Sequence, residues 1–211
     1  MDGTLVDSEL YSERAVRELL AKYELSGEGI DYSTFYGITW ASIAHLLQQR
    51  FTELQGNDIA GPLQELFHSI GLASPPPPIP GSAAAVTAAF EVAKTAIATS
   101  SNRASLEVVM DDLGIRHLLT TTVASEDYGC SKPDPECYLT VAARLGSSPE
   151  RCLVFEDSIP GIRAAKAAGM SVIAVTYRST DIQLATELAD ATVVDFSEIG
   201  NLFEHVTTRA G

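Results

Sequence analysis

The 211-residue sequence has few cysteines, little basic charge and no long apolar run, and each shortage argues against a class of protein. No stretch approaches the roughly 18 consecutive apolar residues of a membrane-spanning helix, and no charged-then-apolar leader precedes a small-residue cleavage site. Cys130, Cys137 and Cys152 are odd in number and lack CxxC spacing, which argues against a disulfide framework and against a zinc site. We therefore expect a soluble, cytoplasmic protein whose cysteines are structural thiols.

Basic residues are outnumbered by acidic ones, 14 to 28, which gives a formal net charge of −14 at pH 7. Long-range repulsion then opposes binding to nucleic acid or to an anionic membrane surface. We expect neither as a partner, and we take a monomer as the default state. An anionic substrate would need a local cationic group to hold it.

The first third of the chain has only helical periodicity. Apolar residues recur at helical spacing over residues 8–23, and residues 40–51 and 57–72 favour two further helices. The proline-rich segment 74–81 cannot form a helix or a central strand, and it is expected to be an extended linker. The sequence therefore predicts an all-helical block followed by a stiff connection.

After the linker, short apolar runs alternate with amphipathic stretches. Strands are expected over 95–99, 120–124, 152–155, 171–175 and 191–194, with helices between them over 104–113, 135–145, 159–168 and 182–188. Such alternation indicates an α/β fold, a doubly wound parallel sheet with crossover helices, into which a small helical cap is inserted. We assign residues 1–8 and 80–211 to the core and residues 9–79 to the cap.

Polar residues follow the predicted strands, at the end of a parallel sheet where ligands bind. These are Thr99–Ser101, Lys132 in a loop, and Glu156 with Asp157; the turn Asp2–Thr4 is a further polar segment. Oxygen ligands of this kind bind Mg²⁺, and a metal, a lysine and hydroxyls together neutralise phosphoryl oxygens. The inventory suits a phosphate group held with a divalent cation.

Four runs of the sequence, at residues 1–9, 97–101, 131–135 and 154–162, resemble in order the four motifs of the haloacid dehalogenase superfamily. The room for a helical cap between the first two is similar to that in the subgroup of β-phosphoglucomutase and small sugar-phosphate phosphatases. The resemblance covers essentially the whole chain. It implies a Rossmann-like core and Mg²⁺-dependent hydrolysis of small phosphate monoesters, such as sugar or polyol phosphates, through an aspartyl-phosphate.

The resemblance also implies roles for three acidic residues. Asp2 matches the general acid that protonates the leaving alcohol and then activates water, and its backbone carbonyl is expected on the metal. Glu156 and Asp157 match the acidic pair that completes the Mg²⁺ shell, one directly and one through water. The alternatives are that Asp2 is an ordinary turn residue and that the acidic pair only favours a helix dipole.

Three further residues are implied to contact the substrate phosphate. Thr99 and the adjacent Ser100 match the hydroxyls that bind the phosphoryl group, and Lys132 matches the lysine that pairs with nucleophile and phosphate. Thr99 is alternatively an N-cap of the next helix, and Lys132 a solvated surface lysine. Arg103 either helps to hold an anionic substrate or is solvated in the first turn of that helix.

Several nearby residues have interpretations tied to the backbone. Gly3 and Gly161 are expected where backbone and side chains approach closely, and Gly81 in the turn into the next helix. Asp7, or alternatively Ser8, is expected to cap the first helix of the cap.

The resemblance places the attacking aspartate two residues before the general acid, which is the position immediately before Met1. The 211 residues do not include it, so we expect this chain alone to be inactive and the active form to carry upstream residues. Those residues would include a central strand between the strands that end near Thr99 and Phe155. The alternative is a catalytically inactive relative that binds a phosphorylated metabolite.

The cap loop of residues 35–40 is expected to select the substrate. In the mutase branch an arginine in this loop holds a second phosphate, and Trp40 stands at the matching place; Ser12 replaces a cap histidine. Hydrolysis is therefore favoured over a phosphosugar mutase activity. Trp40 is alternatively a residue of the cap core.

Overall fold

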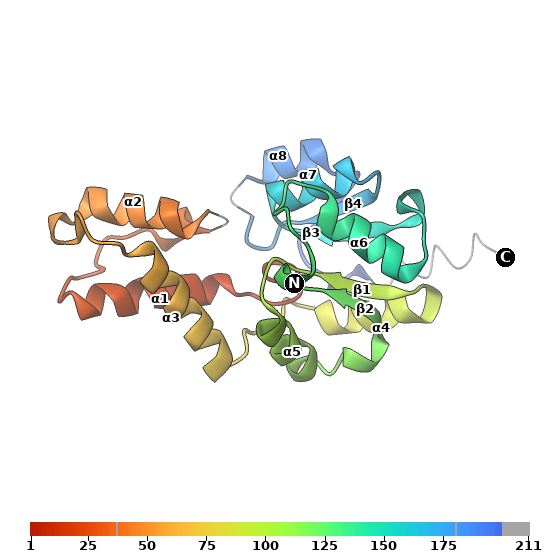
Figure 1. Ribbon diagram of the computed structural model, residues 1–211, viewed down its shortest axis with the longest axis horizontal. Coiled ribbons are helices and arrows are strands. Elements are labelled where there is room, and N and C mark those ends of the chain that lie inside the picture. The colour runs from red at the N-terminus through yellow and green to blue at the C-terminus, as the bar shows by residue number, and fades with distance from the viewer. Residues whose placement is uncertain (37, 180, 200–211) are drawn as a thin grey trace. The chain divides into compact units, whose positions relative to one another are not determined.

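The computed structural model describes residues 1–36, 38–179 and 181–199 (Figure 1). The chain divides into two compact units, Met1–Asp7 with Pro77–Gly211, called here the α/β unit, and Ser8–Pro76, called the helical unit. The divisions lie slightly before the expected ones because the segments on either side of the helical unit pair with each other. The Asp7 amide donates to the Pro77 carbonyl at 2.8 Å, and the Ile79 amide donates to the Leu5 carbonyl at 2.9 Å.

The helical unit consists of α1 (Glu9–Lys22), α2 (Trp40–Arg50) and α3 (Ala60–Ala73), with short 3₁₀ turns between them. All three lie where the apolar periodicity predicts them, and the described part of this unit contains no strand. Its core joins the apolar stripes of the three helices, with Leu19, Leu20, Ile43, Leu47 and Leu63 fully buried.

The described part of the loop of residues 35–40 contributes to this core. The Trp40 ring lies 5.3 Å from the Phe67 ring, and Phe35 is buried. Trp40 thus packs as a core residue of the helical unit. Gly37, the glycine of the loop, lies outside the described residues.

Over its described residues, the α/β unit has five short parallel strands, close to where the sequence predicts them. They are β1 (Thr95–Ala98), β2 (Leu119–Val123), β3 (Leu153–Glu156), β4 (Ser171–Val175) and β5 (Ala191–Val193). The helices are α4 (Ser82–Val92), α5 (Arg103–Asp112), α6 (Glu136–Leu145), α7 (Ile159–Ala167) and α8 (Ile182–Leu188). The α/β class with parallel strands is therefore confirmed.

Side chains that alternate along the strands face two different cores. Ala98 and Val172 pack with α6, α7 and α8, whereas Ile97 packs with α5 and Val175 packs with α4. Helices thus cover both faces of the strands, as Figure 1 shows for α6 and α7 on one side and α4 and α5 on the other. This is the doubly wound arrangement, because successive strand residues point to opposite faces.

The strands form two sheets instead of one. In the described chain β1 pairs with β2, and β3, β4 and β5 pair in that order, while no ladder joins β1 to β3. The single sheet that the sequence predicts is therefore not continuous among the described strands. The core beneath α6 and α7 spans both sheets, with Val123 from one and Val172 from the other.

Two interpretations of turn residues have different outcomes. Gly81 stands directly before α4 with a left-handed φ of 77°, and a Cβ there would lie 2.5 Å from the Phe196 carbonyl oxygen, so a glycine is required. Asp7 does not cap α1, because Ser8 occupies the N-cap position. The Asp7 carboxylate is buried and accepts from Arg178 at 2.6 Å, an ion pair that draws it away from the helix end.

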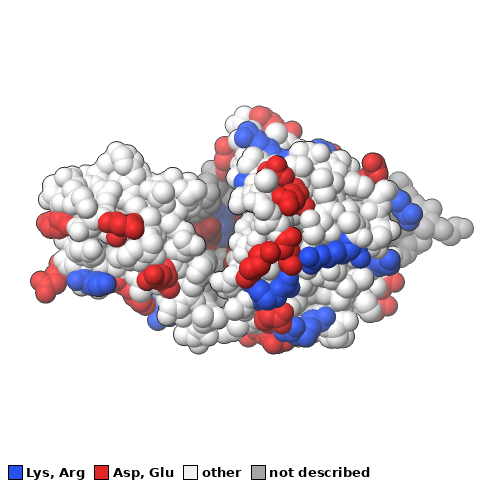
Figure 2. All heavy atoms as spheres, viewed as in Figure 1, with Lys and Arg blue, Asp and Glu red and all other residues white. Residues whose placement is uncertain are grey.

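The surface carries mixed charge. Figure 2 shows acidic and basic side chains interspersed on the face in view, without a broad basic area. Ion pairs such as Lys166–Asp190 account for part of this mixing. Among the described helices, none has the length and apolar character that a bilayer crossing requires.

Candidate active site

The turn that carries Asp2 contacts the end of β1. The Ser101 hydroxyl donates to Asp2 Oδ2 at 2.7 Å, and the Ser101 amide donates to Thr99 Oγ1 at 3.0 Å. The Thr99 amide in turn donates to the Val123 carbonyl of β2. The short polar segment after β1 therefore holds the Asp2 carboxylate in place.

Thr99 is buried, and its hydroxyl group is still able to donate a hydrogen bond. Its side chain is only an acceptor in the contact with Ser101, so the O–H can donate to a ligand. The interpretation of Thr99 as the N-cap is wrong, since Asn102 caps α5 by accepting from the Ser105 amide at 2.9 Å.

Tyr128 is a residue of this site that the sequence analysis missed. Its hydroxyl donates to the Thr99 carbonyl at 3.2 Å and lies 3.3 Å from the Ser100 hydroxyl, while Ser100 itself is exposed. Tyr128 thus ties the lysine-bearing loop to the hydroxyls after β1. No periodicity signals it, because the contact spans 29 positions of sequence.

Lys132 points inward, so its interpretation as a solvated surface lysine is wrong. Its side chain is 12% exposed, and its Nζ lies 2.5 Å from Glu156 Oε1. Tyr138, which was also missed, donates its hydroxyl to the same oxygen at 3.2 Å, and its ring centroid lies 5.0 Å from the Lys132 Nζ. A buried tyrosine usually finds a partner for its hydroxyl, and this was the signal available at position 138.

Glu156 uses both of its oxygens for contacts within the protein. Oε1 accepts from Lys132 and Tyr138, and Oε2 accepts from the amides of Asp157 at 2.6 Å and Ser158 at 2.9 Å. Burial by itself raises the pKa of Glu156, but the charge and hydrogen bond of Lys132 outweigh it and lower the pKa. Glu156 is therefore an anion that orients Lys132.

Lys132 and Tyr138 keep their protons in this environment. Burial lowers the pKa of Lys132, yet the Glu156 carboxylate overcomes this and holds it well above its usual value. Burial and the same carboxylate raise the pKa of Tyr138 well above its usual range. The ammonium is thus charged and the phenol is a donor at neutral pH.

Asp157, unlike Glu156, has a carboxylate oxygen that could coordinate a metal ion. Oδ1 accepts from the Thr4 hydroxyl at 2.7 Å, and no donor to Oδ2 is found among the described residues. Burial, followed by the charge of Glu156, raises the pKa of Asp157. The ionised Glu156 thus disfavours charge on Asp157, and a cation beside Asp157 would relieve the repulsion.

Gly3 and Gly161 lie at close approaches, as predicted. A Cβ at Gly3 would stand 2.0 Å from Asp157 Oδ2, and a Cβ at Gly161 would stand 1.8 Å from Glu156 Oε1. Because no side chain fits at either place, glycine lets the Asp2 turn and the start of α7 meet the two acids.

Arg103 lies outside this network of contacts. Its guanidinium forms an ion pair with Asp127 and donates to the Thr122 hydroxyl at 2.6 Å. Arg103 therefore braces β2 and the turn after it, and it is not solvated in the way the alternative interpretation expected.

The structure brings the candidate residues into one connected region. Asp2 joins the hydroxyl segment after β1 through Ser101, and Thr4 joins the same turn to Asp157, which adjoins the Lys132–Glu156 pair. The strands β1 and β3 end here, so the region lies at the carboxyl ends of the strands. Such an edge is where open α/β sheets bind ligands.

Comparisons with known proteins show the family to which the chain belongs. A family model described as haloacid dehalogenase-like hydrolase matches residues 1–169. The fructose-1-phosphate phosphatase YqaB of Escherichia coli (strain K12) is 32% identical over 83% of this chain and 93% of its own length. The validoxylamine A 7'-phosphate phosphatase of Streptomyces hygroscopicus subsp. limoneus is 28% identical over 94% of this chain and 92% of its own length.

A solved structure with a related fold is CbbY from Rhodobacter sphaeroides in complex with phosphate. The two sequences are 25% identical. The superposition covers 95% of this chain and 93% of the CbbY chain, with a TM-score of 0.71. The family model covers well over half of the chain, and the Escherichia coli relative exceeds 30% identity across most of it. The chain therefore belongs to the haloacid dehalogenase-like hydrolase family.

Proposed function

We propose that the protein hydrolyses small phosphate monoesters, of the sugar or polyol phosphate class, in a Mg²⁺-dependent reaction. The observation that carries this proposal is the connected set of contacts that links Asp2 and Ser101 to Asp157 and the Lys132–Glu156 pair. It combines one buried ammonium, hydroxyl donors and several carboxylates, which suits a phosphoryl group. Relatives that are phosphatases of phosphorylated sugars support the same substrate class.

The donor set is suited to Mg²⁺. Asp157 has an oxygen without a described donor beside the ionised Glu156, and Asp2 lies on the same turn as Thr4, which donates to Asp157. We propose that Asp157 and the Asp2 backbone carbonyl hold the ion, with Glu156 acting through water. Bound Mg²⁺ would neutralise phosphoryl oxygens and lower the cost of charge on them.

The side chains divide the remaining work. The Thr99 and Ser100 hydroxyls and the Lys132 ammonium hold the phosphoryl oxygens. Asp2 gives its proton to the leaving alcohol and then takes one from the attacking water. Ser101 orients Asp2 for both steps by its 2.7 Å hydrogen bond. The carboxylate that attacks phosphorus is expected at the position immediately before Met1, where the resemblance places it.

We propose that the helical unit serves as a cap that selects the substrate. Hydrolysis is favoured over phosphosugar isomerisation because Trp40 stands where the resemblance places an arginine for a second phosphate. That ring packs against Phe67 and carries no charge. A substrate with a single phosphate therefore fits this cap better than a bisphosphate.

Phosphate release from an aryl phosphate tests the proposal. The chain with an aspartate added before Met1, and with the upstream strand where the natural protein has one, would be assayed with p-nitrophenyl phosphate and then with a panel of sugar and polyol phosphates. We expect turnover in Mg²⁺ that stops when EDTA removes the metal. Lys132→Ala, which removes the buried ammonium, is expected to abolish most of it.

The opposite outcome distinguishes the second candidate function. Binding of sugar phosphates by a folded protein without any phosphate release would show a non-catalytic phosphometabolite-binding relative. Loss of both binding and release would reject both functions.

A further inference from the structure

The loop of residues 128–134, called here the lysine loop, places Lys132 in the site although it has no regular secondary structure over most of its length. Lys132 reaches the buried Glu156 carboxylate from this loop. A long side chain in an irregular loop has many alternative conformations, so something must restrict the loop for the contact to persist.

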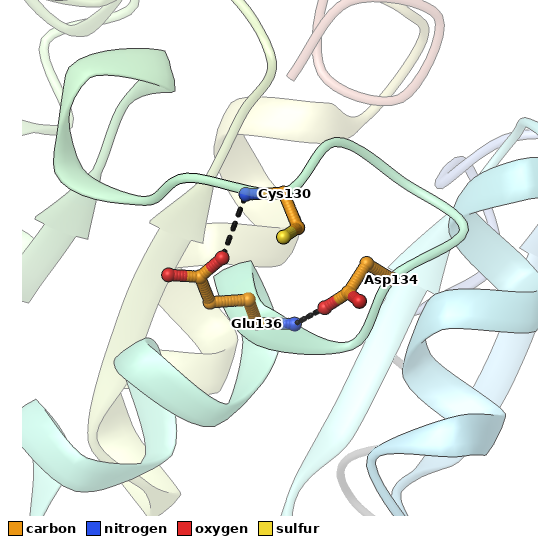
Figure 3. A group of neighbouring side chains, drawn as sticks. All are labelled: Cys130, Asp134 and Glu136. Carbon is orange, nitrogen blue, oxygen red and sulfur yellow. Dashed lines mark hydrogen bonds between the residues drawn. The ribbon is translucent and has the colours of Figure 1, made fainter.

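Glu136, the first residue of α6, closes the loop onto the helix. Its Oε2 accepts from the amide of Gly129 at 3.1 Å and from the amide of Cys130 at 2.7 Å, on one side of Lys132. On the other side, its own amide donates to Asp134 Oδ1 at 2.9 Å. Figure 3 shows the Glu136 side chain turned back to the Cys130 backbone and Asp134 turned to the Glu136 amide.

The helix that carries Glu136 is a firm anchor. The next two residues of α6, Cys137 and Tyr138, are buried in the core, and Tyr138 contacts Glu156. The first turn of α6 therefore holds the backbone of the lysine loop through Glu136 and supports the end of the Lys132 side chain through Tyr138.

The grouping of Cys130, Asp134 and Glu136 is explained by this closure. Their ligand atoms lie within 4.8 Å of one another, which is also compatible with a loose metal cluster. Both carboxylates, however, already accept backbone N–H groups of the loop and helix. Hydrogen bonds from Gly129 and Cys130 lower the pKa of Glu136, so it is an ionised acceptor at neutral pH.

We propose that Glu136 is a positioning residue that holds the lysine loop closed and so delivers the Lys132 ammonium to the phosphate-binding site. The consequence for catalysis rests on the proposed function. The structural part, that Glu136 governs the burial of Lys132, does not depend on it.

Amine labelling tests the structural part on the protein as it is. A limiting amount of an acylating reagent is applied, and mass spectrometry reads the labelling of Lys132 against exposed Lys22 in the same molecule. Glu136→Ala should raise the relative labelling of Lys132 about tenfold, the change expected for a lost hydrogen bond to a charged group. Glu136→Gln keeps an acceptor oxygen and should stay within about twofold of the unchanged protein.

A matched control is Asp190→Ala. Asp190 also accepts a backbone amide, that of Val172, and it pairs with Lys166 far along the chain from the lysine loop. This variant should raise the labelling of Lys166 and leave Lys132 unchanged. If Glu136→Ala does not fold, Glu136→Asp keeps the charge but is too short to reach both amides. Unchanged labelling of Lys132 in the folded variant would overturn the proposal.

A double-mutant cycle tests the consequence for catalysis in the form that carries the upstream aspartate. If Glu136 acts through Lys132, Glu136→Ala lowers kcat/KM in the normal protein and has no further effect in Lys132→Ala. Equal losses in both backgrounds would reject the positioning role. A complete lack of phosphate release by the unmutated protein would instead reject the proposed function, and the labelling result would still stand.

Discussion

At the scale of single residues, the site is organised by the division of labour between two adjacent acids. Both carboxylate oxygens of Glu156 accept hydrogen bonds, from Lys132, Tyr138 and two backbone amides. Asp157 accepts from Thr4 with one oxygen, and its other oxygen has no donor among the described residues. The pKa of Glu156 is thus lowered, whereas that of the adjacent Asp157 is raised. Burial explains the split, because the Lys132 ammonium pairs with Glu156 and the ionised Glu156 then disfavours charge on the neighbouring Asp157.

Asp2→Asn provides the residue-scale test of the proton-transfer role. Loss of a general acid is expected to lower kcat by about 10²–10⁴ in the form with the upstream aspartate. Ser101→Ala removes only the hydrogen bond that orients Asp2, so a loss of about tenfold is expected. Steady-state phosphate release measures both, and Asp112→Asn at an exposed end of α5 is the control. Full activity of Asp2→Asn would contradict the assignment.

Gly161→Ala is expected to destabilise the protein for a steric reason. The new Cβ would stand 1.8 Å from Glu156 Oε1, so the carboxylate that holds Lys132 must move. Overpacking of this kind costs about 1–3 kcal/mol of unfolding free energy, which denaturant titration measures.

Gly71→Ala in α3 is the matched helical control for this substitution. Its Cβ would meet the Tyr11 ring at an ordinary 3.8 Å, so it should gain about 0.5–1 kcal/mol. If Gly161→Ala also gained stability, the Glu156 side chain would be able to move aside without cost, which would contradict the predicted steric destabilisation.

At the scale of elements, the turn between β1 and α5 separates two tasks within four residues. Thr99 offers its hydroxyl proton at the end of the strand, and Ser101 holds Asp2. Asn102 then starts the helix by accepting from the Ser105 amide. Helix capping and ligand binding are therefore assigned to different side chains, although the sequence pattern allowed Thr99 to do both.

Paired substitutions in this turn should separate activity from stability. Thr99→Val removes a hydroxyl proposed to bind the phosphoryl group and should lower kcat/KM about ten- to hundredfold, with a smaller effect on unfolding. Asn102→Ala removes the cap of α5 and should cost about 1 kcal/mol of unfolding free energy with little change in kcat/KM. Asn102→Asp, which can still cap, is the control. The reverse pattern of effects would return the capping role to Thr99.

At the scale of the whole α/β unit, the two sheets are joined by cores and by the Asp2 turn. The core under α6 and α7 includes Val123 from one sheet and Val172 from the other, and Thr4 connects the turn to Asp157 after β3. The site therefore collects charged side chains from segments that are far apart in the sequence. Within a chain of net charge −14, the buried Lys132 supplies positive charge to this region.

The stability of the metal-free protein should fall as the pH rises through the neutral range. Burial and the charge of Glu156 raise the pKa of Asp157 from 3.8 to about 8. A carboxyl with a raised folded-state pKa contributes stability below its unfolded pKa and loses it as the pH rises through the folded value. Because its pKa is lowered, Glu156 changes its protonation state only in acid. It therefore does not contribute to the change in stability between pH 5 and 9.

Thermal melting in EDTA and in Mg²⁺ at about pH 6 and pH 9 measures this effect. Mg²⁺ should raise the melting temperature more at the higher pH, because the ion binds the ionised carboxylate. Asp157→Asn is neutral in both the folded and the unfolded state, so in EDTA its stability should change less between pH 6 and pH 9, and its advantage over the unmutated protein should be larger at pH 9. Equal pH dependence of the two proteins would contradict the shifted pKa.

The order of most strands and helices could be predicted from the sequence alone, and the candidate site residues could be proposed from it. Local periodicity predicts β4 and α8 at their observed bounds, because alternation and helical spacing are properties of neighbouring residues. The acidic pair stands at the end of β3, and Lys132 lies in the loop region between β2 and α6, as the linear order predicts.

Only the tertiary structure decided how those residues are held. Ser101 reaches Asp2 across 99 positions and Tyr138 reaches Glu156 across 18, and Tyr128 joins Thr99 from another loop. Which hydroxyl meets which carboxylate depends on how crossover helices bring distant turns together. The sequence therefore predicts which residues are candidates for the site, and packing determines which side chains hold them.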